Sequence, residues 1–417
     1  MAARHTERLF GMEAEHGRWI LVGAGCLINI CLGSVYSYSV FRIPVQNLFQ
    51  CTSTESGLPF TVFVAFSALM MLVGGRLMGL LGPKKIGIMG GILVGVGWML
   101  AGILPQMVPS IWTLAFTYGV IGGSGVGLGY GATLAVANHW FPDKRGLALG
   151  LTIAGLGGSP VVSANVAGRL IEANGPLYTF HAMGVAFLVI VVALSFLLRY
   201  PTAAWRPSGL RTDATASAAR IDFEPGRMVK TSTFWGLFTG YTIGAMAGLM
   251  AISISSPVAT EVIRLETATA AGLVGVFALF NGASRPLWGW LTDRMTPRWT
   301  ASISMLLILS ASLLMLGATE GTLVLYIVAF VAFWMCLGGW LAIAPTATAT
   351  FFGSKNYAKN YGYVYIAYGV AAIPSNLVAG SSLDLFGSYD VAFMTTAALA
   401  AIGAVVALVY MKPPKHR

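Results

Sequence analysis

The chain has 417 residues, of which 56% are hydrophobic and only 10% are charged, with a mean hydropathy of +0.76. Ordinary soluble domains carry about 25% charged residues, so this composition excludes a typical soluble domain and predicts a protein of the lipid bilayer. The net charge of +10 would suggest nucleic acid in a soluble protein, but here the basic residues fall in short segments between apolar runs, and no nucleic-acid partner is expected.

Apolar runs long enough to cross a bilayer recur twelve times along the chain. The polar residues 1–17 precede the first run and are interpreted as a cytoplasmic lead rather than a signal peptide. The predicted spans are 18–43, 56–81, 86–104, 110–138, 146–172, 178–199, 232–258, 268–291, 299–318, 322–350, 360–382 and 388–411. Residues 200–231 have the composition of a cytoplasmic linker and separate two six-helix halves, 18–199 and 232–411, with a cytoplasmic tail at 412–417. We therefore expect an all-α membrane protein with twelve transmembrane helices.

Lysines and arginines are unevenly distributed between the two sides of these spans. If both termini face the cytoplasm, all eight lysines and twelve arginines lie in the inward segments, and three arginines lie in the outward ones: Arg42, Arg169 and Arg264. The remaining two, Arg76 and Arg285, lie within spans. The positive-inside rule therefore predicts cytoplasmic termini in a plasma membrane, which is the inner membrane of a bacterium.

Arg285 lies well inside the predicted span 268–291, in the stretch FNGASRP. An arginine in the hydrocarbon region costs a few kcal/mol or more, so we expect it to face a cavity and to bind an anion. The alternative is an arginine that snorkels to the cytoplasmic edge, ~9 Å away. Asn281 lies four residues earlier on the same helix face, where it either completes the site or hydrogen-bonds a neighbouring helix.

No Asp or Glu lies near the middle of a predicted span, so the buried carboxylate relay typical of proton coupling is missing. The four cysteines show no metal-ligand spacing, and disulfides are not expected. The glycine-rich stretches GGSGVGLGYG and GLTIAGLGGSP follow no strand and lie within spans, which favours helix packing over nucleotide binding. We expect no cofactor, no metal and no enzymatic activity.

Two turns in corresponding positions of the halves are alike: GRLMGLLGPKK after the second span and WGWLTDRMTPR after the eighth. Two similar six-helix halves suggest a transporter with its site between them. Twelve spans, a long central loop and these basic turns resemble the major facilitator superfamily, whose loop signature the second turn matches through the acid–base pair Asp293 and Arg294. In the first turn, Gly79 stands where the acid usually is.

Longer segments resemble the branch that contains the oxalate–formate antiporter and the monocarboxylate transporters. They are GSVYSYSVFRIPV, GVGLGYGATLAVANHWFPDKRG, LFNGASRPLWG and KNYGYVYIAYG, and the likeness runs over nearly the whole chain. The resemblance implies that Arg285 binds the substrate carboxylate. Some proton-coupled relatives have an aspartate at the position of Asn281. Oxalate-type relatives have a second cation at the position of Tyr368 and a tyrosine at that of Leu156.

The resemblance also implies an aromatic lining for the site, because Tyr36 and Tyr130 match family tyrosines that face the cavity. Tyr365 lies three residues before Tyr368 on one helix face, and Trp340 follows a glycine pair. The alternative for each aromatic residue is helix packing or anchoring at the membrane interface. The residues expected to bind substrate are Arg285, Asn281, Tyr36, Tyr130, Leu156, Trp340, Tyr365 and Tyr368.

Charge balance favours a monocarboxylate as the substrate. One guanidinium balances one carboxylate, whereas a second, unpaired carboxylate would cost several kcal/mol in a buried site. An apolar side chain at Leu156 suits the alkyl end of a lactate- or pyruvate-like acid. We therefore expect a secondary active transporter that works by alternating access, coupled to protons or to a counter-anion. The alternatives are a dicarboxylate antiporter of the oxalate type and a carboxylate receptor that transports nothing.

Overall fold

The computed structural model describes residues 8–414 except 142, 144, 203, 204, 206, 208–221, 354 and 355. The predicted N-terminal lead, central linker and C-terminal tail therefore lie partly outside the described residues. Within the described part, nine helical segments are long and apolar enough to cross a membrane. The chain is thus a helical membrane-spanning protein by length and composition of its helices.

The first half of the chain, called here the N-half, begins with a hairpin of two short strands, β1 (Arg8–Leu9) and β2 (Met12–Glu13), that the sequence did not predict. A 3₁₀ turn, η1 (Gly33–Ser37), and a π-helical stretch, η2 (Ala115–Gly122), interrupt its helices. The helices are α1 (Ala14–Leu32), α2 (Tyr38–Phe49), α3 (Ser53–Ser56), α4 (Leu58–Met107), α5 (Ile111–Leu114), α6 (Gly123–Trp140), α7 (Arg145–Gly158) and α8 (Pro160–Ser195).

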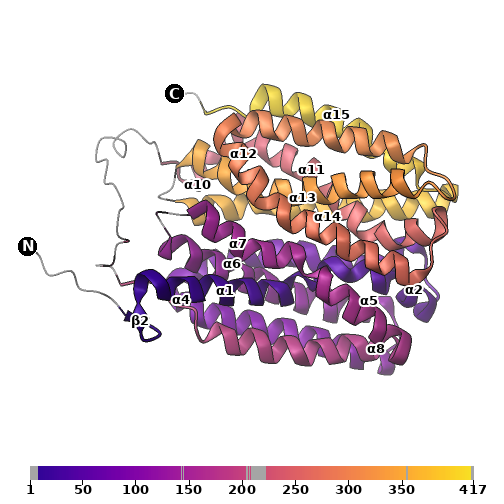
Figure 1. The fold of residues 1–417 in the computed structure, drawn as a ribbon, viewed down its shortest axis with the longest axis horizontal. Coiled ribbons are helices and arrows are strands. Elements are labelled where there is room, and N and C mark those ends of the chain that lie inside the picture. The colour runs from indigo at the N-terminus through magenta and orange to yellow at the C-terminus, as the bar shows by residue number, and fades with distance from the viewer. Residues whose placement is uncertain are drawn as a thin grey trace, which may run out of the picture.

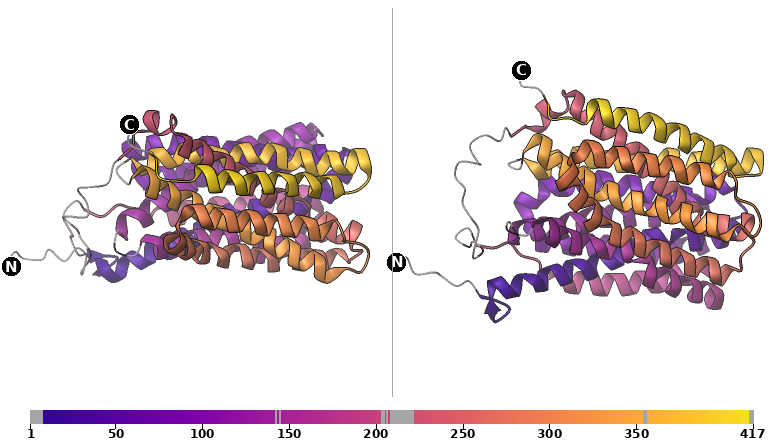
Figure 2. Two further views of the ribbon diagram at one scale, coloured as in Figure 1. Left: turned by 90° about the horizontal axis from the view of Figure 1, so that it is seen from above. Right: turned by 45° about the horizontal axis from the view of Figure 1, so that its top comes forward.

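The second half of the chain, called here the C-half, forms a bundle beside the first (Figure 1). Its elements are α10 (Pro225–Met228), α11 (Ser232–Pro257), the π-helical η3 (Val258–Val262), α12 (Thr267–Met315), α13 (Leu323–Phe352), α14 (Tyr357–Phe386) and α15 (Asp390–Tyr410). The helices of both bundles run roughly along the long axis of the molecule, as two further views confirm (Figure 2). We call the end that carries β1, β2 and the end of α15 the near end, and the opposite end, where α2 ends, the far end.

Three of the long helices contain a residue that leaves the helical region. Gly82, Gly175 and Thr296 have φ angles of 73°, 81° and 71°, and a proline follows each of them. A residue before proline is kept out of the α region, whereas the proline itself suits the first turn of a new helix. The hydroxyls of Thr292 and Thr300 lie 3.2 Å apart across the last of these breaks. Eight residues of straight helix would separate them by ~12 Å, so the chain turns back at Thr296.

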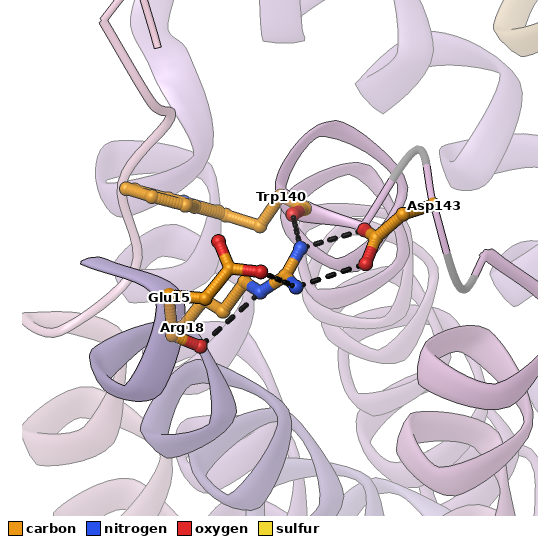
Figure 3. Close-up of polar contacts among 4 residues, drawn as sticks. All are labelled: Glu15, Arg18, Trp140 and Asp143. Carbon is orange, nitrogen blue, oxygen red and sulfur yellow. Dashed lines mark hydrogen bonds and ion pairs between the residues drawn. The ribbon is translucent and has the colours of Figure 1, made fainter. Parts of the chain in front are cut away.

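At the near end of the N-half, the buried side chain of Arg18 connects two helices through hydrogen bonds (Figure 3). Arg18 on α1 donates to both carboxylate oxygens of Asp143, at 2.6 and 2.9 Å, and to the carboxylate of Glu15 at 2.6 Å. It also donates to the backbone carbonyl of Trp140 at 3.0 Å, and its guanidinium lies 4.5 Å from the ring centroid of Phe141. The start of α1 is therefore tied to the end of α6.

The two halves meet through α11, α12 and α14 of the C-half, which pack against α2, α4, α7 and α8 of the N-half. At the far end this contact is polar. Asp384 on α14 accepts hydrogen bonds from the backbone nitrogens of Ser53 and Thr54, at 3.1 and 3.0 Å. Asn376, also on α14, donates to the carbonyl of Thr54 at 3.0 Å. The halves are therefore closed against each other at the far end.

Candidate substrate site

A cavity of about 1270 Å³ lies between the two halves and reaches the near end. Its deep wall includes Tyr130, Arg285 and Tyr361. Residues from segments at the near end line its mouth: Tyr200, Phe223, Gly353, Pro413 and Pro414. Typical small-molecule pockets measure about 300–1,000 Å³, so this space is large enough for a small molecule and an access route to it.

Arg285 lies in the wall of this cavity with only 2% of its surface exposed. Its Nη1 donates to the backbone carbonyl of Ile153 on α7 at 2.8 Å, and its Nη2 donates to Oδ1 of Asn281 at 2.9 Å. Its Nε has no hydrogen-bond partner among the described residues. In the described part of the chain both ion pairs involve Arg18, so Arg285 has no carboxylate partner there. Donor groups of a buried positive charge therefore remain available to an anion.

Asn281 holds the guanidinium from its own helix. Its Nδ2 donates to the backbone carbonyl of Trp334 on α13 at 2.8 Å, which leaves Oδ1 directed at Arg285. One turn further on, Ser284 donates to the carbonyl of Met335 at 3.0 Å and fixes the same pair of helices. Asn281 thus makes the helix–helix hydrogen bond considered for it and also contacts Arg285.

Gly157 on α7 lies directly against this pair and is not among the residues predicted from the sequence. A Cβ atom there would lie 2.6 Å from Oδ1 of Asn281 and 2.9 Å from both Nε and Nη2 of Arg285. A side chain at this position would therefore displace the guanidinium. The glycine-rich stretch of α7 serves close packing, as expected, but this particular glycine makes room for Arg285.

Four of the predicted tyrosines gather around Arg285. The hydroxyls of Tyr36 in η1 and Tyr368 on α14 share a hydrogen bond of 2.8 Å that joins the two halves. The ring of Tyr365 stacks on Tyr368 at 5.3 Å and lies 6.0 Å from that of Tyr130 on α6. The charge of Arg285 acts on all four hydroxyls. The hydroxyl of Tyr130 has no partner among the described residues and lies at the cavity wall.

The two other predicted residues contact other parts of the fold. Trp340 on α13 packs against α11, where its ring stacks on that of Tyr241 at 6.0 Å and abuts Gly244. Leu156 is buried, and its backbone abuts Gly33 in η1. Of the eight predicted residues, Arg285 and Tyr130 belong to the described lining of the cavity, and the other six do not. Tyr241 stands between Trp340 and the cluster, since its ring also stacks on Tyr368 at 6.2 Å.

Tyr361 is a further cavity residue that is not among those predicted from the sequence. Its ring lies 5.7 Å from that of Tyr365, and it is part of the cavity lining. The four-residue spacing between these two tyrosines places them on one face of α14 and could have identified it. No such pattern marks Tyr241, Ile153 or Gly157, which only the packing of helices from distant parts of the chain brings to the site.

The mouth of the cavity contains the titratable groups His139, Tyr200 and Asp293. Burial raises the pKa of Tyr200 to about 12, so its phenol is neutral at physiological pH. Gly79 and Asp293, from the corresponding turns of the halves, both line this space. Arg294 lies with its guanidinium 4.9 Å from the ring centroid of Trp290 rather than in an ion pair with Asp293. Among the described residues, no group of acidic, histidine or cysteine side chains is placed to hold a metal ion.

Comparisons with known proteins agree with this architecture. The family model of the major facilitator superfamily matches residues 24–333 and 241–417. The chain is 28% identical to the oxalate:formate antiporter of Oxalobacter formigenes, over 91% of this chain and 88% of that protein. It is 24% identical to monocarboxylate transporter 13 of Rattus norvegicus, over 95% and 90% of the two chains.

A pyruvate carrier of the Toxoplasma gondii apicoplast is 26% identical over 84% of this chain and 81% of its own length. Among solved structures, a bacterial homologue of the human lysosomal transporter Spinster, in an inward-facing and unoccupied conformation, is similar in fold. Its TM-score is 0.70 at 16% identity, over 96% of this chain and 98% of that one. The chain therefore belongs to the major facilitator superfamily of membrane transporters, and its relatives are those of the oxalate–formate antiporter and monocarboxylate transporter branch.

Proposed function

We propose that the protein is a secondary active transporter of small monocarboxylates that works by alternating access. The observation that carries this proposal is Arg285, a buried guanidinium with an unpartnered Nε in the wall of a cavity between two helix bundles. A buried cation without an acidic partner is costly, and an anionic substrate is the group that offsets this cost.

The proposed topology divides the three interrupted helices at Gly82, Gly175 and Thr296, which turns nine helical segments into twelve spans. Residues 18–199 and 232–411 then form two six-helix halves joined by a linker at 200–231. The positive-inside rule supports cytoplasmic termini, and the location we propose is the inner membrane of a bacterium. With the near end cytoplasmic, the cavity opens inward and the far end is closed toward the outside.

In this scheme the carboxylate binds the free donors of Arg285, because a guanidinium can hold a carboxylate through two parallel hydrogen bonds. Asn281 keeps the guanidinium in place, and the unpartnered hydroxyl of Tyr130 is available to the α-hydroxyl or keto oxygen of the substrate. The alkyl end lies against apolar cavity residues such as Leu149 and Ile153.

Binding also prepares the carrier to change its conformation. Arg285 belongs to the C-half and its acceptor Ile153 to the N-half. The hydrogen bond between them must therefore break when the two halves move apart at the depth of these residues. A bound carboxylate supplies new acceptors and neutralises the charge. The loaded site therefore moves between the two access states more easily than the empty one.

A monocarboxylate fits the charge of the cavity better than a dicarboxylate. Arg285 is the one lysine or arginine among the described lining residues. The position at which oxalate-type relatives have a second cation is Tyr368, a neutral phenol bonded to Tyr36. Oxalate exchange is the second candidate, because the chain is 28% identical to an oxalate:formate antiporter. A receptor that does not transport is less favoured, since the chain matches transporters along nearly its whole length.

Uptake of labelled L-lactate into proteoliposomes tests the proposal. We expect the wild-type protein to take up lactate. Excess unlabelled pyruvate should suppress this uptake, whereas the same concentration of oxalate should not. Repeating it with an imposed pH gradient, and separately with internal unlabelled lactate, distinguishes proton coupling from anion exchange. Suppression by oxalate but not by pyruvate would favour the dicarboxylate exchanger. Binding of lactate without any uptake under either gradient would favour a receptor.

A further inference from the structure

Arg76 on α4 is the second arginine that lies within a predicted span, and the proposed transport site does not use it. The residue is exposed, yet it does not belong to the described lining of the cavity. The exposed residues Leu69 and Leu80 lie seven positions before it and four positions after it, which places all three on one face of the helix. Gly75 and Met78, on another face, line the cavity. Arg76 therefore belongs to the face that α4 turns toward lipid.

The depth of Arg76 makes its charge costly in this setting. It lies six residues before Gly82, where α4 breaks, so its backbone is ~9 Å from the turn along the helix axis. A charge there is costly unless the side chain reaches the headgroup layer or binds an anion. Between Glu55 and Asp143 the chain contains no acidic residue, and α14 contains only Asp384, which lies at the far end. Neither helix can therefore supply a carboxylate, and Arg76 forms no ion pair among the described residues.

Helix α14 completes the surroundings of Arg76 from the other half of the molecule. Nη2 of Arg76 donates to the hydroxyl of Tyr363 at 3.4 Å, which is a long hydrogen bond to a neutral acceptor. Lys359 is exposed and lies four residues before Tyr363 on the same face of α14. The two helices pack closely beside this contact, since a Cβ at Gly362 would lie 3.2 Å from Cδ1 of Leu72. An arginine, a lysine and a phenol thus gather at the boundary between α4 and α14.

This boundary has the form of a lipid site, with basic groups at the near end and apolar faces beyond them. Val370 and Leu377, which lie on the same face of α14 as Tyr363, are exposed as the leucines of α4 are. Basic pockets between transmembrane helices bind the headgroups of anionic lipids, and a guanidinium can hold a phosphate through two hydrogen bonds. We propose that Arg76, Lys359 and Tyr363 bind the phosphate of an anionic phospholipid. Because both halves contribute, the bound lipid bridges them.

An anionic headgroup fits these surroundings better than a zwitterionic one. The turn that follows Arg76 adds Lys84 and Lys85, both exposed, so the basic residues near this end of the boundary have one sign of charge. Phosphatidylethanolamine would bring an ammonium group among them, whereas phosphatidylglycerol carries a net negative charge. Free phosphate has the charge but lacks the acyl chains that lie against the exposed leucines of α4.

Native mass spectrometry of delipidated protein titrated with phosphatidylglycerol tests the proposal. We expect Arg76→Gln to raise the apparent Kd of the first bound lipid about tenfold, because a charge-assisted hydrogen bond is lost. Lys359→Gln should raise it about fivefold, and Arg76→Lys should recover part of the loss. Phosphatidylethanolamine should bind the wild-type protein about tenfold more weakly than phosphatidylglycerol. Glycerol phosphate at the same concentrations should not displace the bound lipid.

Arg169→Gln is the matched control. Arg169 is also an exposed arginine six residues before a helix break, at Gly175 of α8, but Glu172 follows it by three residues. Its substitution should leave the Kd for phosphatidylglycerol unchanged. Wild-type affinity in Arg76→Gln, or an equal loss in the control, would overturn the site, as would equal binding of the two lipids or displacement by glycerol phosphate. If Arg76→Gln does not fold, wild-type affinity in Lys359→Gln has the same meaning. Transport is not measured, so the result is independent of the proposed substrate.

Discussion

The guanidinium of Arg285 on α12 donates a hydrogen bond of 2.8 Å to the backbone carbonyl of Ile153 on α7. The residue proposed to bind substrate therefore also forms a hydrogen bond between the two halves. A hydrogen bond from a charged donor typically contributes about 1.5–3 kcal/mol. In the proposed mechanism this bond has no replacement in the empty carrier when α7 and α12 separate, whereas in the loaded carrier the carboxylate takes over the donors.

This relationship predicts that exchange is faster than net transport. Because about 1.4 kcal/mol corresponds to a factor of ten in rate, labelled L-lactate should enter vesicles preloaded with unlabelled lactate at least about tenfold faster than empty vesicles. Timed uptake assays at the same external lactate concentration and pH measure the ratio of the two uptake rates. Equal rates with and without internal lactate would show that the empty carrier reorients freely and that the Arg285–Ile153 bond does not limit it.

Gly157→Ala should weaken substrate binding, because the added Cβ would lie 2.9 Å from Nε and Nη2 of Arg285 and 2.6 Å from Oδ1 of Asn281. We expect the lactate Kd to rise roughly tenfold as the guanidinium is displaced. Gly158→Ala is the matched control, since a Cβ at that neighbouring position meets nothing within 4 Å. Isothermal titration of purified protein measures both variants. Similar affinities for the two alanine variants would argue against this positioning by Gly157.

The hydroxyls of Tyr36 and Tyr368 should be energetically coupled across the halves, since they share a hydrogen bond of 2.8 Å in a buried setting. Tyr36→Phe, Tyr368→Phe and the double variant form a double-mutant cycle on the lactate Kd. We expect a coupling free energy of about 1 kcal/mol, so that the second substitution costs less than the first. Strict additivity would indicate that the two hydroxyls act independently on binding.

Arg18→Gln should lower the stability of the N-half without changing the lactate Kd of the folded protein. The substitution removes five described hydrogen bonds of the guanidinium to Asp143, Glu15 and Trp140. Because both carboxylates are partly exposed, we expect a loss of about 2 kcal/mol rather than that of a fully buried pair. The apparent melting temperature in detergent measures the loss, with Arg227→Gln as the control. An unchanged melting temperature would contradict a stabilising role for Arg18.

The sequence predicts the helical segments well because the bilayer imposes a simple rule of length and apolarity. The observed α13, α14 and α15 begin and end within a few residues of the predicted spans. The turns at Gly82 and Thr296 also lie between predicted spans, where polar residues interrupt the apolar runs. The β1–β2 hairpin was missed, since two residues per strand give no periodic pattern.

The site was predicted less completely. A charge within an apolar run identifies Arg285, and helical spacing adds Asn281, because both signals are local in the sequence. Ile153, Gly157 and Tyr241 come from other helices, and their importance depends on packing between halves that no spacing encodes. Arg42 shows the same limit, since its position near the end of a span suggests exposure, whereas α11 buries it.

The affinity of Arg285→Gln protein for L-lactate tests the central claim most directly. Arg294→Gln is the control, because that arginine lies exposed at the near end beside Trp290. Isothermal titration of the purified proteins, each checked for wild-type thermal unfolding, gives the three dissociation constants. Loss of two hydrogen bonds from a charged donor should raise the Kd of Arg285→Gln by at least about 100-fold, with the control unchanged. A wild-type Kd in Arg285→Gln would contradict the assignment of Arg285 as the carboxylate-binding residue.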